Sequence, residues 1–347
     1  MEKDPDTIVE HDLFPFIRIY KSGRLERLLG TSVVPAGTDP VTGVISKDVQ
    51  INPTTGVSAR LYVPPHIPSH AKLPILVYFH GGGFVIETAA SPTYHNYLNS
   101  LVSNARILVV SVEYRRAPEH PLPAAYDDCW EVLAWTASGS CPDEWVSVYA
   151  DLGRVYLGGD SAGGNVTHHM AVKAASQGIK IKGLILCHPW FGGSGSIGSE
   201  PEDPVKKENS LKFWRFVYPA TTGLDDLFMN PMAKEERMDS VYKCEKVLVA
   251  VAQKDGLRDR GKLYYDRLNE AVLSGKWDGR VEFYEAEGED HVFYLHNSSC
   301  DKAGEMMQMV VFKLDMAGTT EGLYDYCRLA VVYFVIRYGF HLSLNYM

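Results

Sequence analysis

The sequence of 347 residues lacks the features of a disulfide-rich, disordered or repetitive protein. Its six cysteines are widely scattered with no C-x-x-C pair, so neither a zinc site nor a redox centre is expected, and we interpret them as reduced thiols. It contains no low-complexity tract and no repeat of fixed period. The 46% of apolar and 22% of charged residues are typical of a globular chain that is long enough to bury a large core.

Positive charge and long apolar runs are also scarce. The 34 Lys and Arg residues are outnumbered by 43 Asp and Glu, and the net charge of -9 argues against nucleic acid as a partner and favours a small-molecule ligand. The acidic N-terminus, M-E-K-D-P-D-T-I-V-E-H-D, has no apolar stretch of the kind that signal peptides carry, so a cytoplasmic location is expected. The apolar run near the C-terminus is interrupted by Arg328, Arg337 and His341, and a membrane helix needs about 20 apolar residues, so membrane insertion is not expected.

Short apolar runs rich in β-branched residues alternate with stretches of helical periodicity over most of the chain. This alternation predicts an α/β fold, with a largely parallel sheet that is covered by helices on both faces. The predicted strands are 57–63, 74–79, 107–112, 155–157, 183–187, 247–251 and 281–284, and the predicted helices are 124–135, 163–175, 257–272 and 303–312.

Three segments fall outside this alternation. Residues 1 to 45 and residues 190–232 are interpreted as a lid over the edge of the sheet where the strands end. Residues 315–347 are interpreted as an atypical C-terminal tail. Without the tail, residues 1–314 are predicted to form a single domain.

Two glycine-rich motifs follow predicted strands. G-D-S-A-G, residues 159–163, lies between the strand R-V-Y-L and the helix V-T-H-H-M-A. This strand–turn–helix context is typical of a nucleophile elbow, in which small neighbours let Ser161 take a strained and exposed position. Taken alone, the motif also fits a glycine-rich turn with an idle serine.

The second motif strengthens the first, because acyl transfer needs hydrogen-bond donors aimed at the oxygen that becomes negative. H-G-G-G-F, residues 80–84, follows the strand P-I-L-V-Y-F. Its glycines leave the backbone bare, so the N–H groups of Gly81 and Gly82, with that of Ala162, are predicted to form an oxyanion hole.

A serine nucleophile needs a histidine as base and an acid to orient it, in the chain order Ser, Asp or Glu, His. His291 in E-G-E-D-H-V-F follows a predicted strand and is the candidate base, with His296 as its rival. Three further histidines that follow Ser161 in the sequence are not assigned this role. His168 and His169 lie on the predicted helix after the serine, and His188 lies at the end of a predicted strand.

Asp255 is the candidate acid, because it falls just past the predicted strand 247–251, and ligand chemistry gathers at such strand ends. Asp259 is its competitor, but it lies in a predicted helix where Arg258 and Arg260 would pair with it on a solvated face. Asp290 is a weaker rival, since it points away in most turn geometries.

The motifs together resemble those of the plant carboxylesterase-like family, the hormone-sensitive-lipase-type branch of the α/β-hydrolases. The resemblance covers residues 8–314. It is carried by F-I-R-I-Y-K-S-G-R-L-E-R, S-A-R-L-Y-V-P, H-G-G-G-F, Y-R-R-A-P-E-H-P-L-P-A-A-Y-D-D, G-D-S-A-G-G-N and G-E-D-H-V-F.

The resemblance implies the α/β-hydrolase fold, with a mostly parallel eight-stranded sheet, helices on both faces and a helical cap built partly from the N-terminal segment. It implies a serine carboxylesterase that hydrolyses small acyl esters through an acyl-enzyme, with no cofactor and no metal. The matching positions are Ser161, Asp255 and His291 for nucleophile, acid and base, and Gly81, Gly82 and Ala162 for the oxyanion hole.

Relatives of this kind also include gibberellin receptors that have lost the catalytic histidine, and dehydratases and cyclases that use the scaffold for elimination, so the fold does not settle the reaction. His291 counts against a receptor, and Ser161 stands where isoflavanone dehydratases usually have threonine, so hydrolysis is favoured over a lyase, a cyclase or a receptor. The sequence departs from the family at Arg116, which is usually apolar, and in the tail after Leu314.

Overall fold

Alternate residues of the central strands point to opposite faces of one sheet, and both faces are buried. In the computed structural model, which describes residues 4–68 and 70–315, Ile75, Val77 and Phe79 belong to one core cluster. Leu76 and Tyr78, which alternate with them, belong to the other. This pattern arises because the strand is apolar at every position, which suits a sheet that is covered on both sides.

The main sheet has eight strands in the order β11-β10-β9-β8-β6-β7-β5-β4. Their bounds are β4 (Ile45–Gln50), β5 (Ser58–Val63), β6 (Leu73–Phe79), β7 (Leu108–Glu113), β8 (Ala150–Asp160), β9 (Gly183–Cys187), β10 (Lys246–Ala252) and β11 (Arg280–Ala286). All neighbours run parallel except β5, which is antiparallel to β4 and to β7. The predicted mostly parallel, eight-stranded sheet is confirmed.

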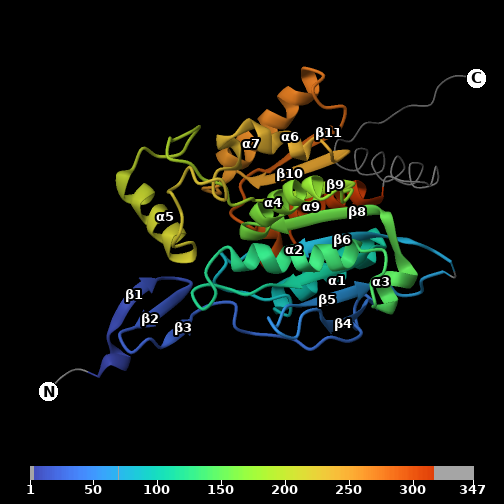
Figure 1. The fold of residues 1–347 in the computed structure, drawn as a ribbon, viewed down its shortest axis with the longest axis horizontal. Coiled ribbons are helices and arrows are strands. Elements are labelled where there is room, and N and C mark those ends of the chain that lie inside the picture. Colours follow the sequence, from blue (N-terminus) through green and yellow to red (C-terminus); the bar gives the residue numbers. More distant parts are fainter. Residues whose placement is uncertain (1–3, 69, 316–347) are drawn as a thin grey trace, which may run out of the picture. The chain divides into compact units, whose positions relative to one another are not determined.

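Helices cover both faces of this sheet, as predicted (Figure 1). One core cluster is closed by α2 (Ala124–Ala137), α3 (Glu144–Tyr149), α4 (Ala162–Ser176), α6 (Glu235–Val241) and α7 (Arg258–Leu273). The other is closed by α1 (Pro92–Ala105), α8 (Phe293–His296) and α9 (Asp301–Asp315). No helix in the described part of the chain is both long and apolar enough to cross a membrane.

The N-terminal segment differs from the helical cap that was expected. After the short 3₁₀ helix η1 (Pro5–Thr7), the strands β1 (Val9–Leu13), β2 (Ile17–Tyr20) and β3 (Leu25–Arg27) form a separate antiparallel sheet. The second predicted lid segment does contain a helix, α5 (Pro204–Val217), which is followed by η2 (Pro231–Ala233).

Figure 1 shows α5 and the small sheet together at one side of the main sheet. The rings of Phe16 and Phe213 join them, with centroids 5.6 Å apart. Apart from its first residue, the predicted tail over residues 315–347 lies outside the described residues.

The turn between β8 and α4 passes very close to the end of β6. A Cβ atom on Gly163 would lie 1.9 Å from the carbonyl oxygen of Phe79, and one on Gly159 would lie 2.4 Å from the same oxygen. Between them, Ser161 takes φ 52° and ψ -117°, which is rarely adopted outside glycine. The glycines of G-x-S-x-G are therefore required by a contact between neighbouring strand ends.

Replacing Gly163 by alanine is expected to lower the free energy of unfolding by about 2 kcal/mol or more, because the methyl group meets a backbone oxygen that cannot move alone. The matched control is Gly304→Ala in α9, where no heavy atom lies within 4 Å of the new Cβ. That control should be neutral or stabilising by up to about 1 kcal/mol. Urea unfolding measures both, and equal stabilities would contradict the packing described.

Candidate active site

A cavity of about 620 Å³ lies where several central strands end, and Ser161 and His291 both line it. Ser161 follows β8, and His291 lies in the loop after β11. Most of the wall is apolar and comes from the small sheet, the segment around α5 and the loops after β6, β10 and β11. These apolar residues are Phe16, Leu29, Ile86, Trp190, Phe213, Leu257, Val292 and Leu295.

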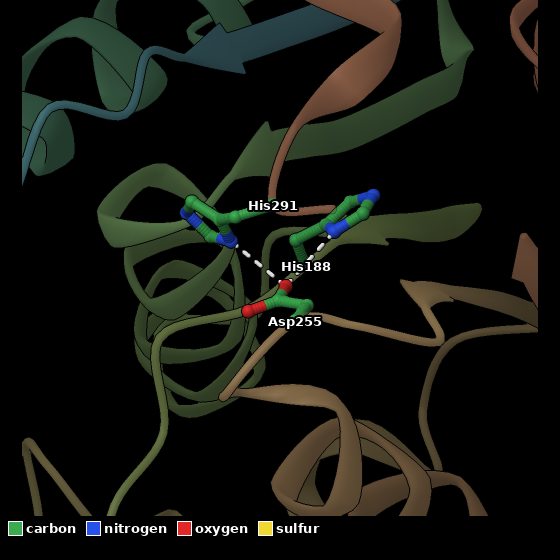
Figure 2. Close-up of side chains that lie close together, drawn as sticks. All are labelled: His188, Asp255 and His291. Atoms are coloured by element: carbon green, nitrogen blue, oxygen red, sulfur yellow. Dashed lines mark hydrogen bonds and ion pairs between the residues drawn. The ribbon is translucent and has the colours of Figure 1, made fainter. Parts of the chain in front are cut away.

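Asp255 contacts the ring of His291, as Figure 2 shows. The Nδ1 atom of His291 lies 2.8 Å from Oδ2 of Asp255, and the other carboxylate oxygen accepts the backbone N–H of Leu257 at 2.9 Å. Because an ionised carboxylate only accepts hydrogen bonds, Nδ1 is the donor. This fixes the tautomer, so that Nε2 carries the lone pair of the neutral ring.

The charges of this pair are set by burial and by the hydrogen bond. Burial would raise the pKa of Asp255, but hydrogen bonds from His188 and His291 outweigh it and hold the pKa well below its usual value. Burial lowers the pKa of His291, whereas Asp255, Asp160 and Asp290 raise it, and the net result is a pKa above the ordinary histidine value. The carboxylate is therefore ionised beside an imidazole of increased basicity.

His188 is a second imidazole on the same carboxylate, which the sequence reasoning did not assign to the site. Its Nδ1 lies 3.0 Å from Oδ2 of Asp255, so this oxygen accepts from two rings (Figure 2). The ring is fully buried, and its Nε2 has no hydrogen-bond partner in the described part of the chain. Burial lowers the pKa of His188, so the ring is neutral and donates from Nδ1. The signal was available, because His188 and Asp255 follow the paired strands β9 and β10.

The predicted oxyanion loop is tied to the elbow by Tyr94 of α1. The N–H of Gly81 donates to the Tyr94 hydroxyl at 2.8 Å, and this hydroxyl donates to Oδ2 of Asp160 at 2.9 Å. The expected donor set is therefore corrected at Gly81, whose N–H is already used. Gly82 and Gly83 line the cavity instead, and within the described residues neither N–H has a hydrogen-bond partner.

Asp160, which precedes the serine, is buried beneath this loop. Its second oxygen accepts the hydroxyl of Tyr78 at 2.8 Å. Burial raises the pKa of Asp160 to about 6, against the opposing effect of the two tyrosine hydrogen bonds. The side chain therefore connects β6, α1 and the elbow through hydrogen bonds.

The rival histidines have other partners or positions. Nδ1 of His168 lies 3.0 Å from the hydroxyl of Tyr264, and Nε2 of His169 lies 3.1 Å from the carbonyl of Phe228. His296 is exposed and lines the cavity, as His291 does, but no hydrogen bond to an acid is found for it among the described residues.

The rival acids are also engaged elsewhere. Asp259 forms an ion pair with Arg258 at 2.8 Å and accepts the hydroxyl of Ser199 at 2.7 Å. Asp290 accepts the backbone N–H of His291 at 2.7 Å. Among the three candidates, Asp255 is the one that contacts the ring of His291.

Within the described residues, the side chains of His188, Asp255 and His291 also have the spacing of a metal-ligand set. One donor atom from each lies within 4.8 Å of the others. A metal ion there would have to displace the two protons that the Nδ1 atoms donate to Asp255. The hydrogen-bonded arrangement and a metal centre therefore exclude each other.

Comparisons with known proteins identify the fold and the family. A family model for the alpha/beta hydrolase fold matches residues 76–295. Probable carboxylesterase 2 of Arabidopsis thaliana is 44% identical over 302 residues, which cover 86% of this chain and 94% of that protein. The chloroplastic tuliposide A-converting enzyme 2 of Tulipa gesneriana is 47% identical over 305 residues, which cover 86% of this chain and 77% of that protein.

Solved structures of esterases are also similar to this chain. The hyperthermophilic esterase from the archaeon Pyrobaculum calidifontis has a TM-score of 0.63 and 25% identity, over 80% of this chain and 84% of that chain. A thermostable carboxylesterase cloned from a metagenomic library has a TM-score of 0.62 and 26% identity, over 78% of this chain and 88% of that chain.

Replacing His188 by leucine is expected to slow fluorophosphonate labelling of Ser161 by roughly 10- to 100-fold, because Asp255 loses a hydrogen bond that fixes its carboxylate. The pH at which labelling reaches half its maximum should also rise. Without His188, the Oδ2 atom of Asp255 accepts from His291 alone and stabilises its protonated form more strongly. His188→Asn should retain the parental rate, because asparagine tolerates the φ of 47° and places an amide N–H near the Nδ1 position. Melting curves test the folding of both variants, and a parental rate and midpoint in folded His188→Leu would contradict the assignment.

Labelling of Ser161 should be slow when His291 is protonated and should rise to half its maximum above pH 6.5, since the pKa of His291 is raised. Asp290→Asn should shift this midpoint to lower pH, because it removes a negative charge that raises the pKa and keeps an oxygen that accepts the His291 N–H. Asp266→Asn, on the exposed face of α7, serves as the control and should leave the midpoint unchanged. A rate that is constant from pH 5 to 8 would exclude His291 as the base.

Proposed function

Because the chain belongs to the plant carboxylesterase-like family of α/β-hydrolases, we propose that Ser161, His291 and Asp255 are its nucleophile, base and orienting acid. The protein is a carboxylic ester hydrolase of the serine type, and its substrates are small esters. The observation that carries the assignment of residues is the 2.8 Å contact of His291 with Asp255 in a cavity that Ser161 also lines.

The proposed reaction begins when Oγ of Ser161 attacks the ester carbonyl and its proton passes to Nε2 of His291. Asp255 stabilises the resulting imidazolium, which the low pKa of its carboxyl supports. The imidazolium then donates its proton to the departing alkoxide, so that the alcohol leaves and the acyl group stays on Ser161. In the second half, His291 takes a proton from water as the water oxygen attacks the acyl carbonyl. The imidazolium then returns this proton to Oγ of Ser161 as the acyl–oxygen bond breaks, so that the acid leaves and the serine hydroxyl is regenerated.

The negative charge of the tetrahedral intermediate needs donors that are already oriented. We propose the N–H groups of Gly82, Gly83 and Ala162 for this role. Ala162 is the first residue of α4, where backbone N–H groups have no partner within the helix. One such donor commonly stabilises the transition state by about 2.7–4 kcal/mol. The bond from Gly81 to Tyr94 supports this role indirectly, because it fixes the loop that carries the two glycines.

A lyase or a binding protein on the same scaffold is the alternative. Tuliposide A-converting enzymes of tulip are among the relatives, so proteins of this family carry names other than esterase. Elimination does not require a covalent bond between the substrate and Ser161, whereas hydrolysis by the proposed route does. The acyl-enzyme therefore separates the alternatives.

We also propose the cytoplasm as the compartment. Cys129, Cys141, Cys187 and Cys244 are buried free thiols and Cys300 is a partly buried one, and such thiols are typical of reducing compartments. Several tulip relatives are named as chloroplastic or amyloplastic, and a fluorescent fusion found in plastids would overturn this proposal.

The proposed function predicts a burst of p-nitrophenol, equal in amount to the enzyme, when p-nitrophenyl acetate is mixed with the protein. Ser161→Ala should abolish the burst and lower kcat/KM by at least about 10³-fold, with little change in stability, because the hydroxyl is small. Asp255→Asn should lower kcat by about 10²- to 10⁴-fold, since the amide no longer fixes the tautomer or balances the imidazolium.

Asp259→Asn is the matched control, because it makes the same change on a carboxylate that pairs with Arg258 instead of His291. It should keep kcat within about twofold, because this carboxylate contacts Arg258 and Ser199 and not the ring of His291. A burst that persists in Ser161→Ala, or equal losses in the two Asn variants, would show that the roles are wrongly assigned.

A further inference from the structure

Glu87 places a carboxylate in the wall of the substrate cavity, and the proposed reaction does not use it. Among the described residues, its carboxylate has neither an ion pair nor a hydrogen bond. Arg116 contacts Glu87 only through the backbone. Its Nη1 donates to the carbonyl of Glu87 at 2.6 Å and not to the carboxylate. A charged acceptor is thus left open in a cavity with mostly apolar walls.

The backbone at Glu87 is held in an unusual conformation that orients this side chain. Its φ is 66°, a left-handed value that costs free energy in any residue except glycine. Gly30 makes room for it, since a Cβ there would lie 2.6 Å from the backbone nitrogen of Glu87 and 3.0 Å from its Oε1. Arg116 fixes the backbone carbonyl of Glu87 by a hydrogen bond from its Nη1.

Outside the proposed catalytic machinery, the cavity is also lined by polar residues of two helices. Thr93 belongs to α1, and Asn209 and Ser210 belong to α5. Hydroxyl and amide groups can donate as well as accept, but Glu87, when ionised, can only accept. The wall is therefore suited to a ligand that brings a donor of its own.

We propose that Glu87 is a substrate-binding residue that accepts a hydrogen bond from a hydroxyl or ammonium group of the ester. The proposal rests on the esterase function proposed above and names a class of substrate for it. Substrates of this class are esters whose acid or alcohol part carries a hydrogen-bond donor.

The physical reason is the free energy of covering a charge. An apolar ester that fills the cavity would remove water from the carboxylate without giving a hydrogen bond in return, and this is unfavourable. An ester with a donor replaces the lost water. The carboxylate thus favours esters that carry a hydrogen-bond donor over apolar esters. This preference is measured as the ratio of kcat/KM for the two esters of a pair.

The experiment compares pairs of esters of similar size in which one member carries a hydrogen-bond donor and the other does not. On the alcohol side, 2-hydroxyethyl butyrate is paired with 2-methoxyethyl butyrate, and protonated 2-(dimethylamino)ethyl butyrate with 3-methylbutyl butyrate. On the acyl side, ethyl 3-hydroxybutyrate is paired with ethyl 3-methoxybutyrate. The variants are Glu87→Met, which removes the acceptor, Glu87→Gln, which removes the charge alone, and the control Glu208→Gln on α5, whose exposed carboxylate pairs with Lys212.

The parent is expected to prefer the donor in at least one pair by about tenfold, as expected for one hydrogen bond to a charged group. Glu87→Met should reduce that preference to within about twofold, and Glu208→Gln should keep it. Glu87→Gln should lose a preference for ammonium and keep part of a preference for hydroxyl. The pair that responds identifies the side of the ester and the kind of donor.

Hydrolysis of p-nitrophenyl butyrate, which carries no donor, is measured for every variant, and Glu208→Gln should keep the parental rate. If the parent hydrolyses this ester but does not discriminate within any pair, or if Glu87→Met keeps the parental preference, the proposal is overturned while the esterase function stands. If the parent does not hydrolyse p-nitrophenyl butyrate at all, the proposed function fails, and the binding role of Glu87 fails with it.

Discussion

The close packing of the elbow on the carbonyl of Phe79 is the constraint on which the other parts of the site depend. It holds the ends of β6 and β8 together, so the loop that follows β6 lies beside Ser161. The hydrogen bonds from Gly81 through Tyr94 to Asp160 then connect this loop to the elbow. The proposed nucleophile and the donors proposed for its oxyanion are thus held together by one sheet register.

Left-handed backbone conformations are common at this end of the sheet. Of the eight described non-glycine residues with positive φ, Ser161, His188, Glu87 and Val292 follow strands or lie beside His291, and Phe84 ends the H-G-G-G-F motif. Such conformations persist only where the surrounding structure determines them. Here the surrounding structure is a sheet whose residues are buried on both faces, which supplies the stability that these local conformations lower.

Much of the fold followed from the sequence, because apolar strands and amphipathic helices carry their own periodicity. The central strands from Ser58 to Ala286 were found this way. The strands β1 to β3 were assigned to a helical cap, since they are short and only partly buried and so lack a clear pattern. The helix α1 was not predicted, and the same omission hid Tyr94 as the partner of Gly81.

The residues proposed for catalysis were selected from motifs, and the structure brings His291 and Asp255 into contact. Neither His188 nor Glu87 was selected, because each depends on neighbours that are distant in sequence. The reach of His188 to Asp255 follows from the register of β9 on β10, and the conformation of Glu87 follows from Gly30 and Arg116. A motif records local geometry well, but it does not record whether a polar group is already paired.

The cavity wall has one further consequence, which concerns how such proteins diversify. Phe16 and Phe213 contact each other across the cavity wall, yet neither belongs to the main sheet, and both are only partly buried. Substitutions at these positions would alter the shape of the cavity without disturbing the residues beneath it. Selection can therefore act on substrate preference and on reaction chemistry in separate parts of the gene. Duplicated copies of such a gene can diverge in the esters that their proteins accept, while Ser161, Asp255 and His291 stay the same.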